Sequence, residues 1–585
     1  MARTRGARSG DGEICLDRAN RGQRGGKPIR RILGILALVL CGAYSALQLG
    51  ALGHPLFWQD EGETVMFGQR VLDYGYPKVH SGGNVVYGMG VPLEFAVNAK
   101  LDAYTGSLWG QYYLAAIGVR AGQGVDDLYA RTAWVRLPFA LLGMGGLALL
   151  FLSLGPVFAE RAQGKIAAAA GFGGLLCLST SLLLHLREVR YYAPALALLA
   201  AIVWLQFRRP PGQGIGGPGR ALLMGIALLL LFNFFHPAAL AAGIWIGIEW
   251  VLWARGSAGS LRAQLSRARS LWISLLVCGT LALGIGVAFG IPTLSRIFSE
   301  RWDFGPSLYA ANLVSLVGYL LRYEFLGPLL LAEAALLWTR SRWGAVPEDA
   351  RLLHARGSLW RLSIIYALVG AANPVFFERY FVPLGPLLVL LVLLDLENLW
   401  RGIARTRVAS PSLAPVRAFA GICMVVLAAL LWLRADELKG RVEEIRHPVE
   451  GPVDVAIEFI RDRYDDPSTL LIATNYEAEP YMYYLGSRVV GRFHAGTPEA
   501  DAAEAALEPD LVIPRSAQPR SLQGVRRYLL ARGFERHELA VADVAYNNIP
   551  ELAAGRLLST THRFRTPRPG QDGPPLAIYT RREAR

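Results

Sequence analysis

The chain has 585 residues, of which 53% are hydrophobic and 18% are charged, and its mean hydropathy is +0.31. A soluble globular protein of this length rarely combines these values, so much of the apolar surface must face lipid. The formal net charge of +14 does not indicate nucleic-acid binding, because the basic residues are spread over short segments between apolar runs and form no single stripe with interleaved aromatic residues.

The apolar runs predict a mainly α fold, a polytopic bundle of membrane-spanning helices, because helices are the spanning structure that such runs allow. Many of these runs approach the ~20 residues needed to cross the hydrocarbon layer, and we expect about eleven spans. Arg322 and Glu324 interrupt one run, whose first half is either part of a span or a surface helix. The expected spans are residues 32–53, 133–153, 166–186, 190–206, 221–235, 238–253, 271–291, 313–339, 360–373, 380–398 and 416–434.

The distribution of arginine predicts the topology. Basic residues are nearly absent between residues 50 and 76 and dense in five segments, at 3–31, 208–220, 255–269, 340–361 and 401–417. By the positive-inside rule these five segments are cytoplasmic. Residues 1–31 are then a basic cytoplasmic tail, followed by a retained first helix, since no small-residue cleavage pattern stands before His54. An odd number of spans places residues 54–131 and the chain after 434 outside an inner (plasma) membrane.

The first outer loop, residues 54–131, is longer than a plain connection requires. Residues 65–72 and 91–101 have helical apolar spacing, which predicts amphipathic helices lying in the membrane interface.

Residues 435–585 predict a small soluble α/β domain, set apart from the transmembrane module at 32–434. Its expected helices are 453–463, 480–485 and 522–532, and its expected strands are 470–473, 488–490, 511–513 and 576–579. The domain contains no GxGxxG or GxxxxGK[ST] motif, so nothing indicates a nucleotide site there.

Two adjacent carboxylates, Asp60 and Glu61, follow the outer end of the first span. One interpretation is structural, because acidic residues favour the N-terminus of a helix. The other is a general base at the lipid-water boundary, where partial desolvation raises the proton affinity of a carboxylate.

With this pair the chain resembles the C-type (GT-C) membrane glycosyltransferases, in particular the bacterial group related to protein O-mannosyltransferases and aminoarabinose transferases. In that family an Asp-Glu pair opens the first outer loop. The resemblance covers about residues 32–400 and implies the GT-C fold. It continues with Gly-Tyr-Pro at 75–77, Val-Pro-Leu at 91–93, Arg-Leu-Pro at 136–138, Arg-Glu-Val-Arg-Tyr-Tyr at 187–192 and Arg-Tyr at 379–380.

The resemblance implies transfer of a hexosyl or pentosyl group from a polyprenyl-phosphate carrier to a hydroxyl of a glycan, lipid or protein. We expect inversion in a single displacement, with Asp60 as the base and Glu61 orienting the acceptor or supporting Asp60. Guanidinium groups suit a lipid phosphate, and we assign Arg190 and Arg379 to it, although snorkelling is the alternative for each. Further binding candidates are Arg187, Tyr191, Tyr380, His236 and Glu94.

Several alternatives stay open. His236 can equally be a capping or packing residue, and some relatives carry a lysine near the position of Glu94 that is missing here. A divalent cation on the outer-loop carboxylates is a further alternative. A transporter or flippase of lipid-linked sugars would need similar charges, but such proteins often show internal repeats and ionisable groups at the bilayer midplane, neither of which is evident here. A non-catalytic assembly subunit would leave the clustered outer charges unexplained.

Overall fold

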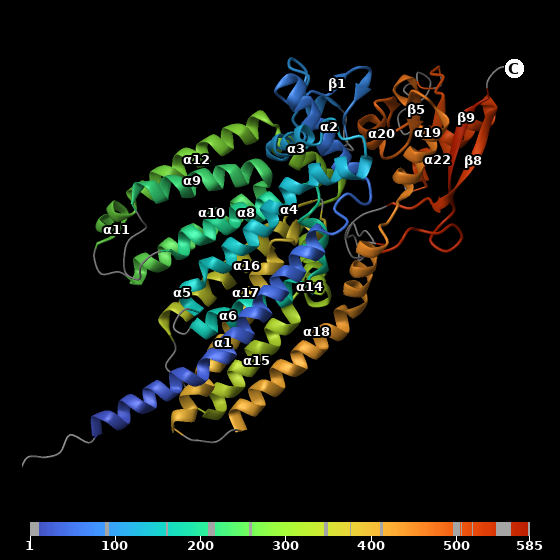
Figure 1. Ribbon diagram of the computed structural model, residues 1–585. Coiled ribbons are helices and arrows are strands. Elements are labelled where there is room, and N and C mark those ends of the chain that lie inside the picture. Colours follow the sequence, from blue (N-terminus) through green and yellow to red (C-terminus); the bar gives the residue numbers. More distant parts are fainter. Residues whose placement is uncertain are drawn as a thin grey trace, which may run out of the picture.

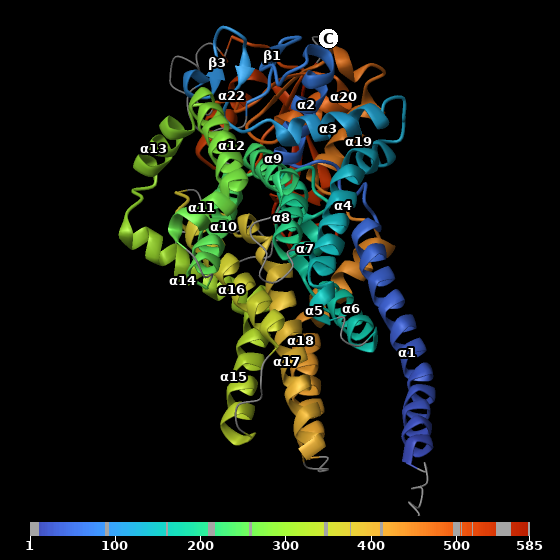
Figure 2. The same cartoon turned by 90° about the vertical axis from the view of Figure 1, so that its left-hand side faces the viewer.

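The computed structural model describes residues 11–87, 93–158, 162–208, 217–256, 260–343, 349–374, 376–409, 414–494, 504, 506–516, 519–545 and 563–582. Long helices form a bundle, and the first outer loop and the C-terminal elements lie together at one end of it (Figure 1). Figure 2 shows the same end of the bundle from the side: α2, α3 and α19 lie in this outer layer, and α1, α15 and α18 extend away from it. The architecture agrees with the predicted helical bundle carrying an α/β domain.

The bundle is built from apolar helices of unequal length. Among the described residues, four helices (α1, α4, α10 and α12) are long and apolar enough to cross a membrane, and the bent pair α13–α14 adds a fifth if counted as one span. The expected number of about eleven spans therefore stays a prediction. The helices are α1 (Asp11–Leu49), α4 (Leu128–Ser153), α5 (Gly155–Phe158), α6 (Ala162–Leu176), α7 (Thr180–His185), α8 (Tyr192–Phe207), α9 (Pro218–Phe234), α10 (His236–Gly256), α11 (Leu261–Arg267), α12 (Arg269–Ala288), α13 (Ile291–Arg301), α14 (Pro306–Tyr323), α15 (Leu326–Trp343), α16 (Ala350–Ala371), η2 (Glu378–Phe381), α17 (Leu384–Ala409) and α18 (Ala414–Arg446).

Two expected spans are each divided into two helices. Residues 166–186 form α6 and α7, because Ser179 ends the first run and caps the second by accepting a hydrogen bond from the Leu182 amide at 3.3 Å. Residues 313–339 are broken at Glu324, which is extended and accepts hydrogen bonds from the Ser179 and Tyr319 hydroxyls, each at 3.3 Å. The prediction of one uninterrupted helix was wrong at 166–186, where a buried polar side chain ends the run. The break at Glu324 agrees with the interruption expected there from the sequence.

The first outer loop is a small layer of its own. It contains α2 (Gln59–Tyr74), β1 (His80–Ser81), β2 (Asn84–Val85), η1 (Leu93–Phe95), β3 (Val97–Asn98), β4 (Ala103–Tyr104) and α3 (Gly110–Ala121). The helix predicted at 65–72 is confirmed within α2. The helix predicted at 91–101 is wrong: residues 91 and 92 lie outside the described residues, and the remainder is a 3-10 turn and strand β3 paired with β4.

The C-terminal part contains α19 (Pro452–Arg463), η3 (Pro467–Thr469), β5 (Leu471–Thr474), α20 (Ala478–Leu485), β6 (Arg488–Val490), β7 (Leu511–Ile513), α22 (Pro519–Arg532), β8 (Phe534–Ala542) and β9 (Pro575–Arg581). The five strands form one sheet in the order β6-β5-β7-β9-β8. Strands β5, β6 and β7 are parallel, and β9 is antiparallel to both of its neighbours. Every predicted helix and strand of this region is present, whereas β8 was not predicted.

The C-terminal part packs directly on the outer loop. The Leu56 amide donates to Asp454 Oδ1 at 2.9 Å, and the Gln59 side chain donates to Glu479 Oε2 at 2.6 Å. A Cβ atom at Gly62 would lie 2.8 Å from Pro480, so only glycine allows α2 and α20 to approach this closely. The two segments therefore lie on the same side of the helical bundle.

This packing makes the predicted topology testable. We expect single cysteines at the exposed positions Asp73 and Glu458 to react with a membrane-impermeant maleimide from outside the cell, in a variant without the five native cysteines. A cysteine at Arg262, in a segment predicted to be cytoplasmic, should react only after the membrane is opened. Labelling of positions 73 and 458 from opposite faces would contradict the arrangement.

Candidate active site

Asp60 lies in the first turn of α2 and is held by two arginines from distant parts of the chain. Arg379 Nη2 donates to Asp60 Oδ2 at 2.9 Å, and Arg190 Nη2 lies 3.6 Å from the same oxygen. The Asp60 side chain is 25% exposed, whereas those of Arg190 and Arg379 are 14% and 8% exposed. The structure thus brings together the three residues predicted to carry the reaction, with the carboxylate the most accessible of them.

Each arginine is presented by a tight turn at the end of a helix. Arg190 lies in the short connection between α7 and α8, and its Nη1 donates to the Asp60 carbonyl at 3.1 Å and to Thr64 Oγ1 at 3.0 Å. Arg379 lies in η2, immediately before α17, with its guanidinium 5.0 Å from the ring centre of Trp58 and 4.4 Å from that of Phe377. Such cation-π contacts fix a guanidinium group without using its N–H donors.

Glu61 points to a different element. Its carboxylate is completely buried. It accepts hydrogen bonds from Arg136 Nε at 2.9 Å, from Arg136 Nη2 at 2.5 Å and from the Val189 amide at 3.0 Å. Arg136, on α4, also donates to the carbonyls of Leu52 and Pro55. The contacts of Glu61 therefore tie the outer loop to α4 and to the turn that carries Arg190, and they favour support of Asp60 over contact with an acceptor.

Arg187 is not beside the other two arginines. Its guanidinium donates to the carbonyls of Gly50, Ala51 and His54, at the end of α1. Arg441 reaches the same helix end, donating to the carbonyls of Leu47 and Gly50 at 2.8 Å each. The last carbonyls of a helix lack partners within it and favour positive charge. Arg187 therefore caps the end of α1, and within the described residues no hydrogen bond or ion pair joins it to Asp60.

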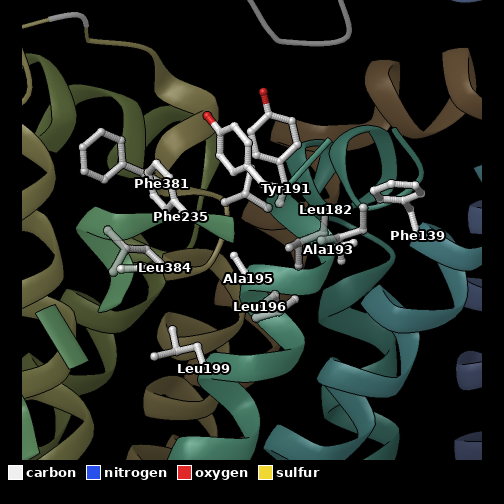
Figure 3. Close-up of a cluster of buried hydrophobic side chains, with 14 of the residues drawn as sticks. Phe139, Leu182, Tyr191, Ala193, Ala195, Leu196, Leu199, Phe235, Phe381 and Leu384 are labelled. Atoms are coloured by element: carbon white, nitrogen blue, oxygen red, sulfur yellow. The ribbon is translucent and has the colours of Figure 1, made fainter. Parts of the chain in front are cut away.

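Tyr191 and Tyr380 contribute their rings to an aromatic wall beside the arginines. Tyr191 stacks on Phe235 with ring centres 4.8 Å apart, and Tyr380 lies 5.6 Å from Phe235. Figure 3 shows Tyr191 and Phe235 with Phe381 over the apolar residues of α8, including Leu196. The Arg190 guanidinium lies 5.5 Å from the ring centre of Tyr191, so the aromatic wall adjoins the charged cluster.

The remaining two candidates are not drawn into this cluster. His236 begins α10 and is exposed, and its ring neighbours are Phe232 and Phe235 at 6.3 and 6.5 Å. Glu94 is exposed on η1. Among the described residues, no hydrogen bond or ion pair joins either side chain to Asp60, Arg190 or Arg379.

Several residues around Asp60 were not predicted. Glu63 is buried on the same helix and accepts a long hydrogen bond of 3.4 Å from the Tyr112 hydroxyl. Burial raises the pKa of Glu63 to about 7, Arg190 opposes this shift and Asp60 adds to it. Thr64 and Trp58 contact the arginines as described above. The spacing of Glu63 and Thr64 from Asp60, three and four residues along the helix, is the signal that would have indicated a shared face, whereas Trp58 precedes the helix and gives no such signal. Within the described parts of the chain, no group of three or more His, Cys, Asp or Glu residues could hold a metal ion.

The cluster contains several buried donors without a partner. In the described structure these are Nε of Arg190, Nε of Arg379 and Nε1 of Trp58. Buried polar atoms are paired in most native proteins, so each unpaired donor needs an explanation. Three such donors around one carboxylate are an arrangement that can bind a ligand with several negatively charged oxygens.

Comparison with known proteins gives a fold but no sequence relative. No protein-family profile and no curated protein matches the chain. The oligosaccharyltransferase AglB of Archaeoglobus fulgidus, solved with an inhibitory peptide and a dolichol-phosphate, is similar with a TM-score of 0.50 and 12% identity, over 86% of this chain and 72% of that chain. ArnT of Cupriavidus metallidurans, solved in the apo state, is similar with a TM-score of 0.48 and 12% identity, over 93% and 97% of the two chains. The chain has the GT-C fold, which confirms the fold that the resemblance implied.

Proposed function

We propose that the protein is a membrane glycosyltransferase that moves a sugar from a polyprenyl-phosphate donor to an acceptor hydroxyl on the outer face of the membrane. The observation that carries this proposal is the shared geometry of Asp60, Arg190 and Arg379. A carboxylate that can meet solvent stands beside two largely buried guanidinium groups, each with a buried Nε–H that has no partner in the described structure. A base and an anion site in contact are what a displacement with a phosphate leaving group requires.

The proposed step is a single displacement at the anomeric carbon. The acceptor oxygen attacks this carbon and loses its proton to Asp60, while the bond from the carbon to the phosphate oxygen breaks. The bonding electron pair stays on the phosphate, which leaves as polyprenyl phosphate. A phosphate needs no proton to leave, so one carboxylate is sufficient and no second acid of the glycosidase kind is required. The sugar carbon is inverted.

Arg190 and Arg379 serve both partners of this step. Without a bound sugar donor, the two guanidinium groups hold the Asp60 side chain. When a lipid phosphate binds, some of their N–H groups must hydrogen-bond to the phosphate instead. Charge developing on the leaving phosphate is then stabilised by groups that are already oriented and largely shielded from water. Once the arginines bind the phosphate, they hold the Asp60 carboxylate less tightly, and it is free to contact the acceptor hydroxyl.

The remaining parts of the proposal follow from topology and fold. The site lies on the predicted extracytoplasmic side of an inner (plasma) membrane, where the polyprenyl chain of the donor would lie in the bilayer. AglB, which shares the fold, was solved with a dolichol-phosphate, and this supports a lipid phosphate as the partner here. The acceptor is a glycan, lipid or protein hydroxyl.

Removal of either phosphate arginine should weaken use of the donor. We expect Arg190→Ala and Arg379→Ala each to cost about 1.5–3 kcal/mol of donor binding, because each deletes a charge-assisted hydrogen bond. Lysine should restore only part of the loss, since it lacks the planar fork of donors. The KM for the sugar donor and the KM for the acceptor, measured separately on purified protein, would show whether the loss falls on donor use.

Arg187 provides the matched control. Because its donors are engaged by the end of α1, Arg187→Ala should lower the yield of folded protein and leave the donor KM of the folded fraction unchanged. Unchanged donor kinetics in both the Arg190 and the Arg379 variants would remove them from the site.

A further inference from the structure

We propose that Tyr192 is a further donor-binding residue, whose hydroxyl donates a hydrogen bond to the lipid phosphate, and that the buried pair His185–Glu188 positions it. The inference rests on the proposed function, because it assumes a phosphate between Arg190 and Arg379. It adds a hydroxyl donor to a site described so far by two guanidinium groups and the Trp58 indole.

The Tyr192 hydroxyl is buried and unused. The residue is 1% exposed, and its hydroxyl has no hydrogen-bond partner in the described structure. It begins α8, two residues after Arg190, and its ring meets that of Tyr191 with centres 4.6 Å apart, while the Arg190 guanidinium lies 5.5 Å from the Tyr191 ring centre. A buried phenol usually finds a partner, and beside two guanidinium groups the partner that fits is an anion.

A second pair of buried polar groups lies behind Tyr192. His185 Nδ1 is 3.2 Å from Glu188 Oε2, and both side chains are 1% exposed. The His185 ring meets the Tyr192 ring edge to face, with centres 5.4 Å apart. The other polar atoms of the pair, His185 Nε2 and Glu188 Oε1, have no partner in the described residues. Two ionisable groups are therefore buried next to Tyr192 without any use in the reaction described so far.

The His185–Glu188 pair lies in the turn between α7 and α8, which contains Arg190. Within this turn the Arg190 amide donates to the Glu188 carbonyl at 2.7 Å, and the Val189 amide donates to Glu61. The turn is thus fixed both within itself and to α2, which leaves the Arg190 guanidinium against Asp60 and the Tyr192 ring against His185. Residues that hold reacting groups within a fraction of an ångström can change rates without touching substrate. His185 and Glu188 are positioning residues of this kind.

Binding of sugar-free polyprenyl phosphate to the full-length protein in detergent tests the assignment. Tyr192→Phe, which removes only the hydroxyl, should weaken binding by about tenfold or more, as expected for a hydrogen bond to a charged group. Tyr44→Phe is the matched control: its hydroxyl is also buried without a partner in the described structure, but it lies on α1 and outside the turn that carries Arg190. It should bind like the wild-type protein, and the acceptor KM should be unchanged in both variants.

The positioning pair is tested by a rescue. Glu188→Ala should weaken binding of polyprenyl phosphate, Glu188→Gln should restore most of it because the amide oxygen still accepts from His185, and Glu188→Ala should add little to Tyr192→Phe. Unchanged binding in Tyr192→Phe, with normal binding by the wild-type protein, would overturn this assignment alone. No binding by the wild-type protein would overturn the proposed function and this assignment together.

Discussion

Replacement of Asp60 by Asn is expected to lower the rate of sugar transfer by about 10² to 10⁴. Asparagine keeps the size of the side chain and can still accept a hydrogen bond from Arg379, but it cannot take a proton from the acceptor. Donor binding should be retained or become tighter, because the neutral amide competes less with the phosphate for the two arginines. Single-turnover transfer and donor binding, measured on the same preparation, separate the two effects.

Asp73→Asn is the matched control for this variant. Asp73 is exposed near the end of the same helix and should tolerate the change without loss of transfer. If Asp60→Asn lowers transfer by less than about tenfold in folded protein, general-base catalysis by Asp60 is wrong. The helix N-terminus interpretation of the acidic pair then becomes the better account.

Loss of Arg136 should have the largest effect on stability. Arg136→Met leaves the Glu61 carboxylate completely buried without its ion partner, and breaking a buried pair in this way costs about 3–5 kcal/mol. Of the hydrogen bonds that Glu61 makes with the described residues, the one from the Val189 amide would remain. We expect a strong fall in folded protein and in the midpoint of thermal unfolding in detergent.

A double variant tests whether the instability of Arg136→Met comes from the unpaired charge or from lost packing. Glu61→Gln together with Arg136→Met removes both charges, so it should be more stable than Arg136→Met alone. A double variant that is no more stable than Arg136→Met would show that the ion pair is not the source of the loss. Glu61 would then need another role.

Much of the helical architecture could be predicted from the sequence, because long apolar runs have one stable form in a bilayer. The break at Ser179 could not, since the Ser179 hydroxyl bonds to Glu324, a partner that folding brings from another helix, whereas the charge of Glu324 itself already interrupted its run in the sequence. The helix predicted at 91–101 failed for a related reason: short segments with a few apolar residues satisfy helical and strand patterns alike.

The composition of the site could be predicted better than its division of roles. Outer placement and motif order indicated Asp60, Arg190 and Arg379, although 319 positions separate Asp60 from Arg379. The roles of neighbouring residues depend on direction. Successive residues of a helix project about 100° apart, so Asp60 faces the arginines while Glu61 faces α4. A single sequence does not give the orientation of α2 against the bundle.

Arginines with the same predicted location also proved different. Arg187 and Arg190 are three residues apart, yet the first caps α1 and the second contacts Asp60. Arg136 carried a signal that was not used, because an arginine inside an apolar span usually has a buried partner and a role. Its partner, Glu61, was already among the candidates.

The most direct test of the central proposal is turnover of a polyprenyl-phosphate sugar, radiolabelled in the sugar, by the purified protein in liposomes. The proposal predicts that label passes to an added acceptor and that free polyprenyl phosphate appears in equal amount, with both signals lost in Asp60→Asn. Movement of the intact labelled lipid across the bilayer, without cleavage of the bond between sugar and phosphate, would contradict the proposal and indicate a transporter.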